Sequence, residues 1–164
     1  MLRLAPVMLA AALLLALPHA AQARPDGPLG AYLEHQEGVL VLGIPAVGTL
    51  TDGFGARWGR LHSGLDIGIL RSLDVVAAAP GTVTATGYLA GYEGYGNVVI
   101  VDLGGGHENL YAHLSRVAVK LGQRVEAGQR LGEAGCTGSC TGTHLHFELR
   151  VDGEPVDPLP LMRL

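Results

Sequence analysis

Two histidines near the C-terminal end of the chain have a spacing that suits a metal site. His144 and His146 flank Leu145, and polar and apolar side chains alternate over 143–149, which predicts a β-strand. In a strand the two imidazoles project from the same face, with Cα atoms roughly 6.5 Å apart. Both could address one metal ion, or one could hold the metal while the other acts beside it. Two polar residues on a solvated strand face would give the same alternation.

A second group of metal-binding residue types lies in the first half of the chain. Asp66 follows His62 by four residues, so both side chains point the same way if this segment is extended, whereas Gly64 permits a sharper turn. A catalytic zinc ion takes three side-chain ligands and leaves one position open for water. His62 and Asp66, with one or both histidines of the first pair, meet that requirement. Two histidines and one carboxylate would also suit non-haem iron.

The other histidines divide into two groups. His113 lies in the stretch Tyr-Ala-His-Leu, beside another predicted strand, and is a further candidate for the site. His35 and His107 lie in polar surroundings, which is typical of exposed residues. Spacing alone does not separate metal ligands from acid–base groups among the four remaining candidates, His62, His113, His144 and His146.

Short strands and tight turns are predicted to position these residues. The chain has 25 glycines, and they recur every few residues between short runs of Val, Ile, Leu and Thr. This pattern favours an all-β class. We expect strands over 39–42, 45–50, 97–101, 108–114 and 143–149, a hairpin of 74–79 with 82–86, and short strands joined by glycine turns over 117–135.

The N-terminus has the pattern of a secretory signal peptide. Arg3 precedes an apolar run over 4–17, and Ala21 and Ala23 form a small-x-small cleavage site. An uncleaved anchor helix is the alternative. The predicted organisation is a signal peptide over 1–23, a short lead-in over 24–44 and one domain over 45–164.

Charge and composition exclude other classes of partner. The formal net charge is −4, and no run of Lys and Arg points to nucleic acid. Nothing after the signal peptide suggests a membrane segment, so we expect no stable membrane insertion once it is cleaved. We expect a monomer.

Five stretches of the chain occur in the order of a known enzyme family. They are Phe-Gly-Ala-Arg at 54–57, His-Ser-Gly-Leu-Asp at 62–66, Gly-Tyr-Gly-Asn at 94–97, Tyr-Ala-His-Leu at 111–114 and Thr-Gly-Thr-His-Leu-His-Phe-Glu at 141–148. Together they resemble the lysostaphin-type (LytM-like) zinc endopeptidases, which cut the peptide part of bacterial peptidoglycan. The resemblance extends from roughly residue 45 to residue 158. It implies an antiparallel β-sheet domain with long loops around a zinc groove.

The resemblance also assigns roles to the candidate residues. It implies that His62, Asp66 and His146 bind one zinc ion and that His113 and His144 flank its open position as catalytic histidines. Bound zinc lowers the pKa of water toward about 7 and polarises the scissile carbonyl. Imidazole, with an ordinary pKa of about 6.5, suits the accompanying proton transfers.

Three nearby residues have two alternative roles each. Glu148 lies on the same strand face as the two histidines, so it either orients an imidazole or is a peripheral carboxylate. Trp58 and Tyr95 either line a substrate groove or pack in the core.

Cys136 and Cys140 directly precede the His-Leu-His stretch. In an exported protein so close a pair indicates a disulfide, with free thiols or zinc ligation as alternatives. Closing so short a loop would constrain the unfolded chain by roughly 2 kcal/mol and would stiffen the loop that leads to His144. The pair favours an oxidising compartment.

The sequence therefore predicts an exported zinc endopeptidase of the periplasm or cell exterior. Its expected substrates are peptide cross-links of peptidoglycan, with a D-alanyl bond to a diamino acid favoured over a glycine bridge. The alternative is a regulator that binds and activates another wall hydrolase. Relatives of that kind typically lack a ligand or a catalytic histidine, whereas all five positions are filled here.

Overall fold

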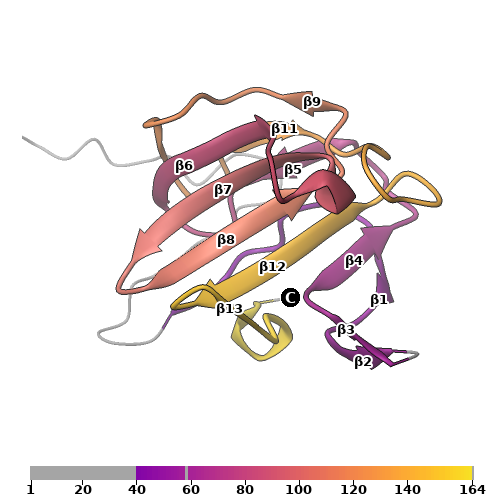
Figure 1. The fold of residues 1–164 in the computed structure, drawn as a ribbon. Coiled ribbons are helices and arrows are strands. Elements are labelled where there is room, and N and C mark those ends of the chain that lie inside the picture. The colour runs from indigo at the N-terminus through magenta and orange to yellow at the C-terminus, as the bar shows by residue number, and fades with distance from the viewer. Residues whose placement is uncertain (1–39, 58, 164) are drawn as a thin grey trace, which may run out of the picture.

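The computed structural model describes residues 40–57 and 59–163, which form an all-β domain (Figure 1). All pairings between the strands of these residues are antiparallel. The helical elements in the described ranges are two 3-10 turns, η1 (Glu93–Tyr95) and η2 (Leu159–Leu161). Neither is a helix of the length and hydrophobicity that a membrane crossing requires. The predicted fold class is confirmed.

The largest sheet has the strand order β1-β4-β12-β8-β7-β6-β10, and β13 pairs with β12 beside this path. Its longest strands, β6, β7, β8 and β12, lie side by side in Figure 1. In chain order the strands are β1 (Thr49–Asp52), β4 (Leu65–Gly68), β6 (Gly81–Tyr88), β7 (Asn97–Gly104), β8 (His107–Ala112), β10 (Arg124–Val125), β12 (Leu145–Val151) and β13 (Glu154–Val156).

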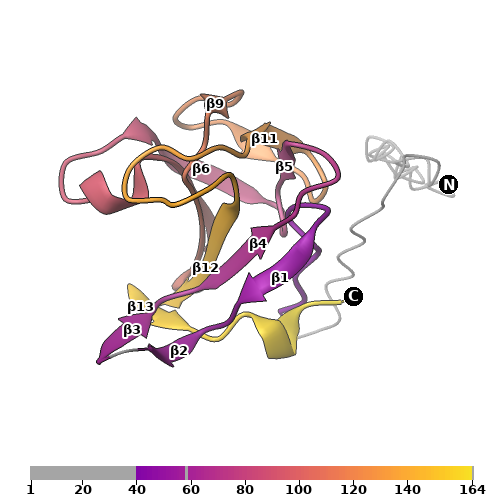
Figure 2. The same cartoon turned by 90° about the vertical axis from the view of Figure 1, so that its right-hand side faces the viewer.

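Two smaller sheets complete the domain. A three-stranded sheet has the order β5-β11-β9, and β2 and β3 form a hairpin. The views in Figures 1 and 2 place these two sheets at opposite ends of the domain. Their strands are β5 (Asp74–Val76), β9 (Arg116–Val117), β11 (Arg130–Glu133), β2 (Gly55–Arg57) and β3 (Arg60–His62).

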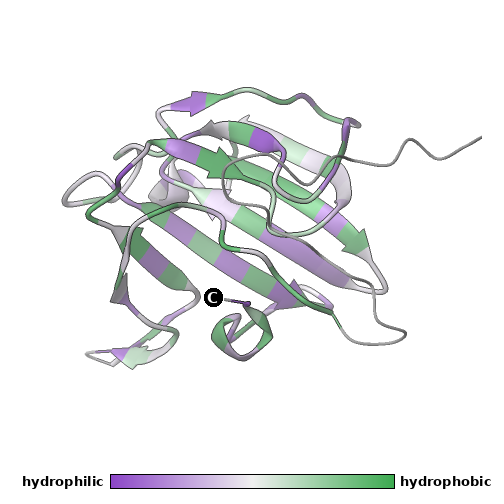
Figure 3. Ribbon diagram, turned by 180° about the vertical axis from the view of Figure 1, so that it is seen from behind, coloured by the Kyte–Doolittle hydropathy of each residue, from purple (hydrophilic) through white to green (hydrophobic). Residues whose placement is uncertain are grey.

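Side-chain alternation gives the large sheet a core face and a second, more polar face, and Figure 3 shows the alternating hydropathy along its strands. Phe147 pairs with Tyr111 on one side and with Leu65 on the other, and all three are on the core face. They pack in or beside one apolar cluster that also contains Val75 and Leu131 of the three-stranded sheet. Burying each large apolar side chain contributes about 1.5–3 kcal/mol, so this cluster fixes the register of β12.

The same register determines which residues lie on the second face, called the site face below. His146 pairs with Ala112 on one side and Asp66 on the other, and Glu148 pairs with Leu110. A small apolar cluster that includes Leu110 and Ala112 lies on this face, partly covered by the segment around η1. The site face is therefore apolar over β7 and β8 and polar where β12 meets β4.

The predicted hairpin of 74–79 with 82–86 is wrong. β5 pairs with β11 and β6 pairs with β7, so the two segments belong to different sheets. Between them the three alanines 77–79 are buried, and Ala78 donates its N–H to the Tyr111 hydroxyl at 2.8 Å. The small side chains let the backbone pass through the core from one sheet to the other. Local alternation predicts strands but does not select their partners.

The predicted entry strands are also wrong in their extents. β1 begins only at Thr49, and Leu42 forms an isolated bridge with Met162. Leu42 is nevertheless buried, and its N–H donates to the carbonyl of Leu161 at 2.8 Å. The predicted signal peptide, most of the lead-in, His35 and Trp58 lie outside the described residues.

Candidate metal centre

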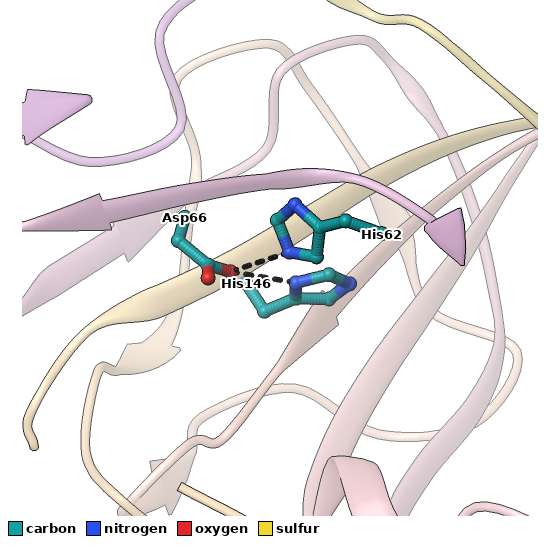
Figure 4. A group of neighbouring side chains, drawn as sticks. All are labelled: His62, Asp66 and His146. Carbon is teal, nitrogen blue, oxygen red and sulfur yellow. Dashed lines mark hydrogen bonds and ion pairs between the residues drawn. The ribbon is translucent and has the colours of Figure 1, made fainter. Parts of the chain in front are cut away.

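The three predicted ligands meet on the site face, as Figure 4 shows. His62 ends β3, Asp66 lies in β4 and His146 lies in β12. The Oδ1 atom of Asp66 is 3.2 Å from Nε2 of His62 and 2.7 Å from Nδ1 of His146. The candidate ligand atoms of the three residues all lie within 4.8 Å of one another.

Strand register and one glycine bring these residues together. Asp66 and His146 are directly paired across β4 and β12, so their side chains share the site face. His62 arrives through the short connection between β3 and β4. A side chain at Gly64 in that connection would collide with the carbonyl oxygen of Phe147. Only glycine lets the backbone pass so close to β12, and the chain bends at Gly64 instead of staying extended from His62 to Asp66.

Each of the two histidines has an acceptor behind its other ring nitrogen. Nδ1 of His62 lies 2.6 Å from the carbonyl oxygen of Gly53, and Nε2 of His146 lies 3.0 Å from Oε1 of Glu148. A carbonyl or carboxylate accepts a hydrogen bond, so these nitrogens carry the protons of the neutral rings. The opposite nitrogens then direct lone pairs toward Asp66. Two imidazole nitrogens and one carboxylate oxygen thus direct lone pairs toward one point, and a cation bound there would be stabilised by all three.

The electrostatics of the centre also draw positive charge to this point, which either a proton on Nδ1 of His146 or a metal ion can supply. Burial lowers the pKa of His146, but hydrogen bonds to Asp66 and Glu148 outweigh it and the pKa is raised overall. Burial raises the pKa of Asp66, but the hydrogen bond and charge of His146, with the charges of the neighbouring histidines, lower it overall. The site therefore favours an ionised carboxylate and positive charge beside it.

The donor set fits zinc. Zinc binds histidine nitrogen and carboxylate oxygen at 2.0–2.2 Å in a tetrahedron, so neighbouring ligand atoms lie about 3.3 Å apart. The His62–Asp66 separation of 3.2 Å matches this spacing, and the His146–Asp66 separation of 2.7 Å is a hydrogen-bond distance. Two nitrogens and one oxygen would leave the fourth position of a tetrahedral ion for water or substrate.

Glu148 is the anchor behind His146. Its side chain is completely buried, and Oε1 accepts hydrogen bonds from Ser63 at 2.5 Å and Tyr95 at 2.8 Å as well as facing His146. Arg150 donates from Nε to Oε2 at 2.7 Å. Burial raises the pKa of Glu148, but the hydrogen bond from His146 above all, with those from Ser63 and Tyr95 and the charge of Arg150, outweighs it and lowers the pKa to about 2. Of its two predicted roles, the structure supports orientation of an imidazole.

Several residues that contact Glu148 or its partner Arg150 were not predicted from the sequence. Arg150 also donates from its guanidinium to the Tyr92 hydroxyl at 2.8 Å, and it lies over the Tyr92 ring at 5.4 Å. The sequence does contain a signal for Arg150, because it continues the alternation of His146 and Glu148 on one face of the strand. Ser63 and Tyr92 come from other segments and give no such signal.

His113 and His144 lie beside the three candidate ligands. Their ring centroids are 4.6 Å apart, and the His113 ring is 5.9 Å from that of His146. Nε2 of His144 is 3.7 Å from Oδ1 of Asp66. All five residues that the sequence singled out are therefore gathered in one place.

His144 lies just before the strand in which it was predicted. β12 begins at Leu145, and His144 forms only an isolated bridge with Gly135. The prediction of a continuous strand from 143 is wrong at this end. The glycines at 135, 138 and 142 in the preceding segment interrupt extended pairing, so the strand starts one residue after His144.

Backbone carbonyls hold the two rings of this second pair. Nδ1 of His113 lies 2.8 Å from the oxygen of Thr137, and Nδ1 of His144 lies 2.8 Å from the oxygen of Gly142. Both rings therefore carry their proton on Nδ1 and a lone pair on Nε2. Burial lowers the pKa of His113 and outweighs the hydrogen bond to Thr137, so the neutral form is favoured.

Other predicted residues have clear positions. Cys136 and Cys140 form the predicted disulfide, with Cα atoms 5.4 Å apart. Tyr95 is partly buried, and its ring lies 5.6 Å from that of His146, so it supports the site from the side of η1. His107 lies at the start of β8 with Nδ1 3.3 Å from the Gly104 oxygen, and it is not among the grouped residues. A cavity of about 360 Å³ adjoins His62 and is also lined by Arg57, Arg60 and Leu61.

Comparison with known proteins identifies the class to which this fold and site belong. The model of peptidase family M23 matches residues 60–158. The chain therefore belongs to peptidase family M23, and its His-Asp-His group is a candidate metal site of a metallopeptidase.

Individual relatives agree with this assignment. The chain is 42% identical over 100 residues to the DD-carboxypeptidase/endopeptidase Mpg of Neisseria meningitidis serogroup B, covering 61% of this chain and 22% of that protein. It is 36% identical over 115 residues to the murein hydrolase activator NlpD of Salmonella typhimurium, covering 70% of this chain and 29% of that protein. The chain thus spans less than a third of the length of these two relatives.

Solved structures share the fold. The catalytic domain of lysostaphin from Staphylococcus simulans superposes with a TM-score of 0.62 at 32% identity, over 69% of this chain and 90% of that one. A zinc containing peptidase from Vibrio cholerae superposes with a TM-score of 0.63 at 30% identity, over 71% of this chain and 39% of that one.

Proposed function

We propose that this protein is an exported zinc endopeptidase that hydrolyses peptide cross-links in bacterial peptidoglycan, and that it acts in the periplasm or outside the cell. The observation that carries the proposal is the pairing of a full candidate ligand set with two further imidazoles. His113 and His144 present Nε2 lone pairs beside the ligands, which is more than metal binding alone requires.

The five residues have distinct roles in the proposed reaction. His62, Asp66 and His146 hold the zinc ion, which when bound lowers the pKa of water and polarises the scissile carbonyl. His113 and His144 have Nε2 available, so they take up the proton of the attacking water, stabilise the developing oxyanion and return a proton to the leaving amine. The lowered pKa of His113 keeps its ring neutral and ready to accept a proton.

Within this class we propose a D,D-endopeptidase, which cuts a D-alanyl cross-link to a diamino acid. The similarity to the DD-carboxypeptidase/endopeptidase Mpg supports this choice. The cavity of about 360 Å³ beside His62 offers space next to the metal ligands for a peptide segment. A glycine bridge is the alternative substrate.

A second function has an observation in its favour. The similarity to the murein hydrolase activator NlpD supports a regulator that binds and activates another wall hydrolase. That function does not require the paired Nε2 atoms of His113 and His144, so the enzymatic proposal is preferred.

Digestion of purified wall sacci of defined cross-link chemistry tests both proposals. The zinc-loaded protein, alone, is expected to release fragments whose masses locate the new ends at the D-alanyl cross-link, and His113→Ala is expected to release none. Cleavage confined to glycine bridges would contradict the D,D assignment. If the protein released nothing by itself but increased release by an added wall hydrolase, the regulator would replace the enzyme.

A further inference from the structure

The loop closed by the disulfide contacts His113, a residue far from it in sequence. This loop comprises residues 136–140 and is called the disulfide loop below. The Thr137 oxygen accepts the hydrogen bond from Nδ1 of His113 at 2.8 Å, and the Thr137 N–H donates to the backbone oxygen of His113 at 3.4 Å. One residue of the loop therefore meets both the ring and the backbone of His113.

The backbone of His113 itself needs this support. Its φ of 61° lies in the left-handed region, which non-glycine residues adopt only when their surroundings hold them there. The His113 N–H donates to the Tyr95 oxygen at 2.8 Å on the side of η1. His113 is thus fixed between the η1 segment and the disulfide loop, and it follows directly after the end of β8.

The disulfide loop is fastened to the same η1 segment. The Ser139 N–H donates to the Gly94 oxygen at 2.8 Å, and a side chain at Gly138 would collide with the backbone of Gly96. The Thr137 hydroxyl accepts from the N–H of Asn97 and donates to the Leu114 oxygen, both at 3.0 Å. The side chain of Thr137 is therefore bonded to Asn97, which begins β7, and to Leu114, which follows His113.

The disulfide restricts the backbone conformations of the loop further than these contacts do. Gly138 has a φ of 74°, and glycines at 135 and 142 flank the loop, so its sequence permits many backbone conformations. The bond between Cys136 and Cys140 removes most of them, because it joins two residues whose Cα atoms must stay close. It encloses only residues 137–139.

We propose that the Cys136–Cys140 disulfide is a positioning element for His113, acting through the carbonyl oxygen of Thr137. A carbonyl accepts only from a protonated nitrogen, so a fixed Thr137 oxygen holds the proton on Nδ1 and leaves the lone pair on Nε2, toward the metal centre. The inference rests on the proposed catalytic role of His113. It gives the cysteine pair a function in catalysis as well as in stability.

The full chain with both cysteines changed to serine tests the proposal. Serine substitution avoids thiol reductants, which would remove zinc. We measure zinc per chain, kcat and KM on a soluble cross-linked muropeptide, and the ring nitrogens of His113 by two-bond ¹⁵N–¹H correlation NMR. In the double variant kcat is expected to fall about tenfold with KM and zinc content unchanged, since a small misplacement of a reacting group slows chemistry more than binding. The ring is expected to change from a single Nδ1–H form to a mixture.

A matched pair at position 137 keeps the disulfide and tests the link from Thr137 to His113 even if the serine variant does not fold. Thr137→Val removes the hydroxyl that bonds Asn97 and Leu114, and Thr137→Ser retains it. Valine is expected to lower kcat and to mix the two ring forms of His113, and serine is expected to restore both readouts.

The outcomes separate this inference from the proposed function. Unchanged kcat and an unchanged Nδ1–H ring in the double serine variant would overturn the positioning role of the disulfide, and the same result in the valine variant would overturn the part assigned to Thr137. Loss of zinc in step with kcat would also overturn it, because the effect would then act through the ligands. A changed His113 ring in a protein whose wild type hydrolyses no cross-link would support positioning and refute the peptidase.

Discussion

Two histidines separated by one residue are held by opposite means. His146 lies within β12, is only 5% exposed, and has the buried, ionised carboxylate of Glu148 behind its ring. His144 lies before the strand, and the neutral carbonyl oxygen of Gly142 is behind its ring. His113 is held like His144, because the neutral carbonyl oxygen of Thr137 lies behind its ring.

The difference fits the roles proposed for His146 and His144. A carboxylate behind a ring raises its basicity and fixes its orientation, which strengthens a metal ligand. A neutral carbonyl fixes the orientation without adding charge, and a ring that must take up and release a proton works best with a pKa near the working pH. The contrast is confined to His146 and His144, because His62, the other proposed histidine ligand, also has a neutral carbonyl, that of Gly53, behind its ring.

Removing the ring of His146 and then that of His144 is the most direct test of this difference. His146→Ala is expected to abolish wall cleavage and to lose zinc, because it removes a ligand and leaves Glu148 facing an empty space. His144→Ala is expected to abolish cleavage while zinc stays bound. Zinc per chain after dialysis, measured beside wall clearing, checks both. Equal zinc loss in the two variants would show that the division of roles is wrong.

Removing the charge behind His146 has the next largest effect. Glu148→Gln keeps the shape of the side chain but leaves the buried Arg150 interaction without its anion. Loss of such a partner behind a metal ligand typically weakens metal affinity 10–100-fold, and we expect about this loss for zinc. Competition with a chelator of known affinity measures it. Unchanged affinity would mean that the carboxylate serves packing alone.

The candidate residues of the metal centre were predictable from the sequence because their signals are local. Alternation places His146 and Glu148 on one face, and the short interval from His62 to Asp66 limits the ways in which they can meet. The division between ligands and catalytic histidines came from family resemblance and stays a prediction. The groups behind the rings follow it for His146 and His144 only.

Long-range partners were not predictable in the same way. Ser63 and Tyr95 reach Glu148 over 85 and 53 residues of sequence, and no pattern in either segment announces this contact. The mistaken hairpin at 74–86 has the same cause, since buried alanines look like strand residues until the second sheet is known. Tertiary packing selects among partners that local sequence leaves equivalent.

Tyr95→Phe is expected to reduce zinc affinity less than Glu148→Gln. It removes one hydrogen bond at 2.8 Å to Oε1 of Glu148 but keeps the ring and the carboxylate. Tyr92→Phe is the matched control, because its hydroxyl bonds Arg150 and not Glu148. The same chelator competition should show a few-fold loss for Tyr95→Phe and a smaller one for Tyr92→Phe, at the scale of a single hydrogen bond. A larger loss of zinc affinity for Tyr92→Phe than for Tyr95→Phe would mean that Arg150 contributes more to the support of His146 than Tyr95 does.

The smallest effect is expected from a charged pair away from the site. Asp74 in β5 accepts from Nε of Arg130 at 2.6 Å, and this hydrogen bond, with one from Ser72, lowers the pKa of Asp74. A carboxyl whose pKa is lower in the folded state adds stability above its unfolded pKa, and that stability disappears as the pH falls through the lowered value. Asp74→Asn should therefore lower Tm slightly at pH 7, and the difference from wild type should vanish in acid.

Calorimetry across this pH range, with zinc affinity measured beside it, checks the prediction. Both partners are well exposed, so the change in Tm should be small, and zinc affinity should not move. Variants of the site must change zinc affinity or kcat by more than this control does. If Asp74→Asn also weakened zinc, general stability would account for part of the Glu148 effect, and the contrast between charged and neutral support of the histidines would be correspondingly smaller.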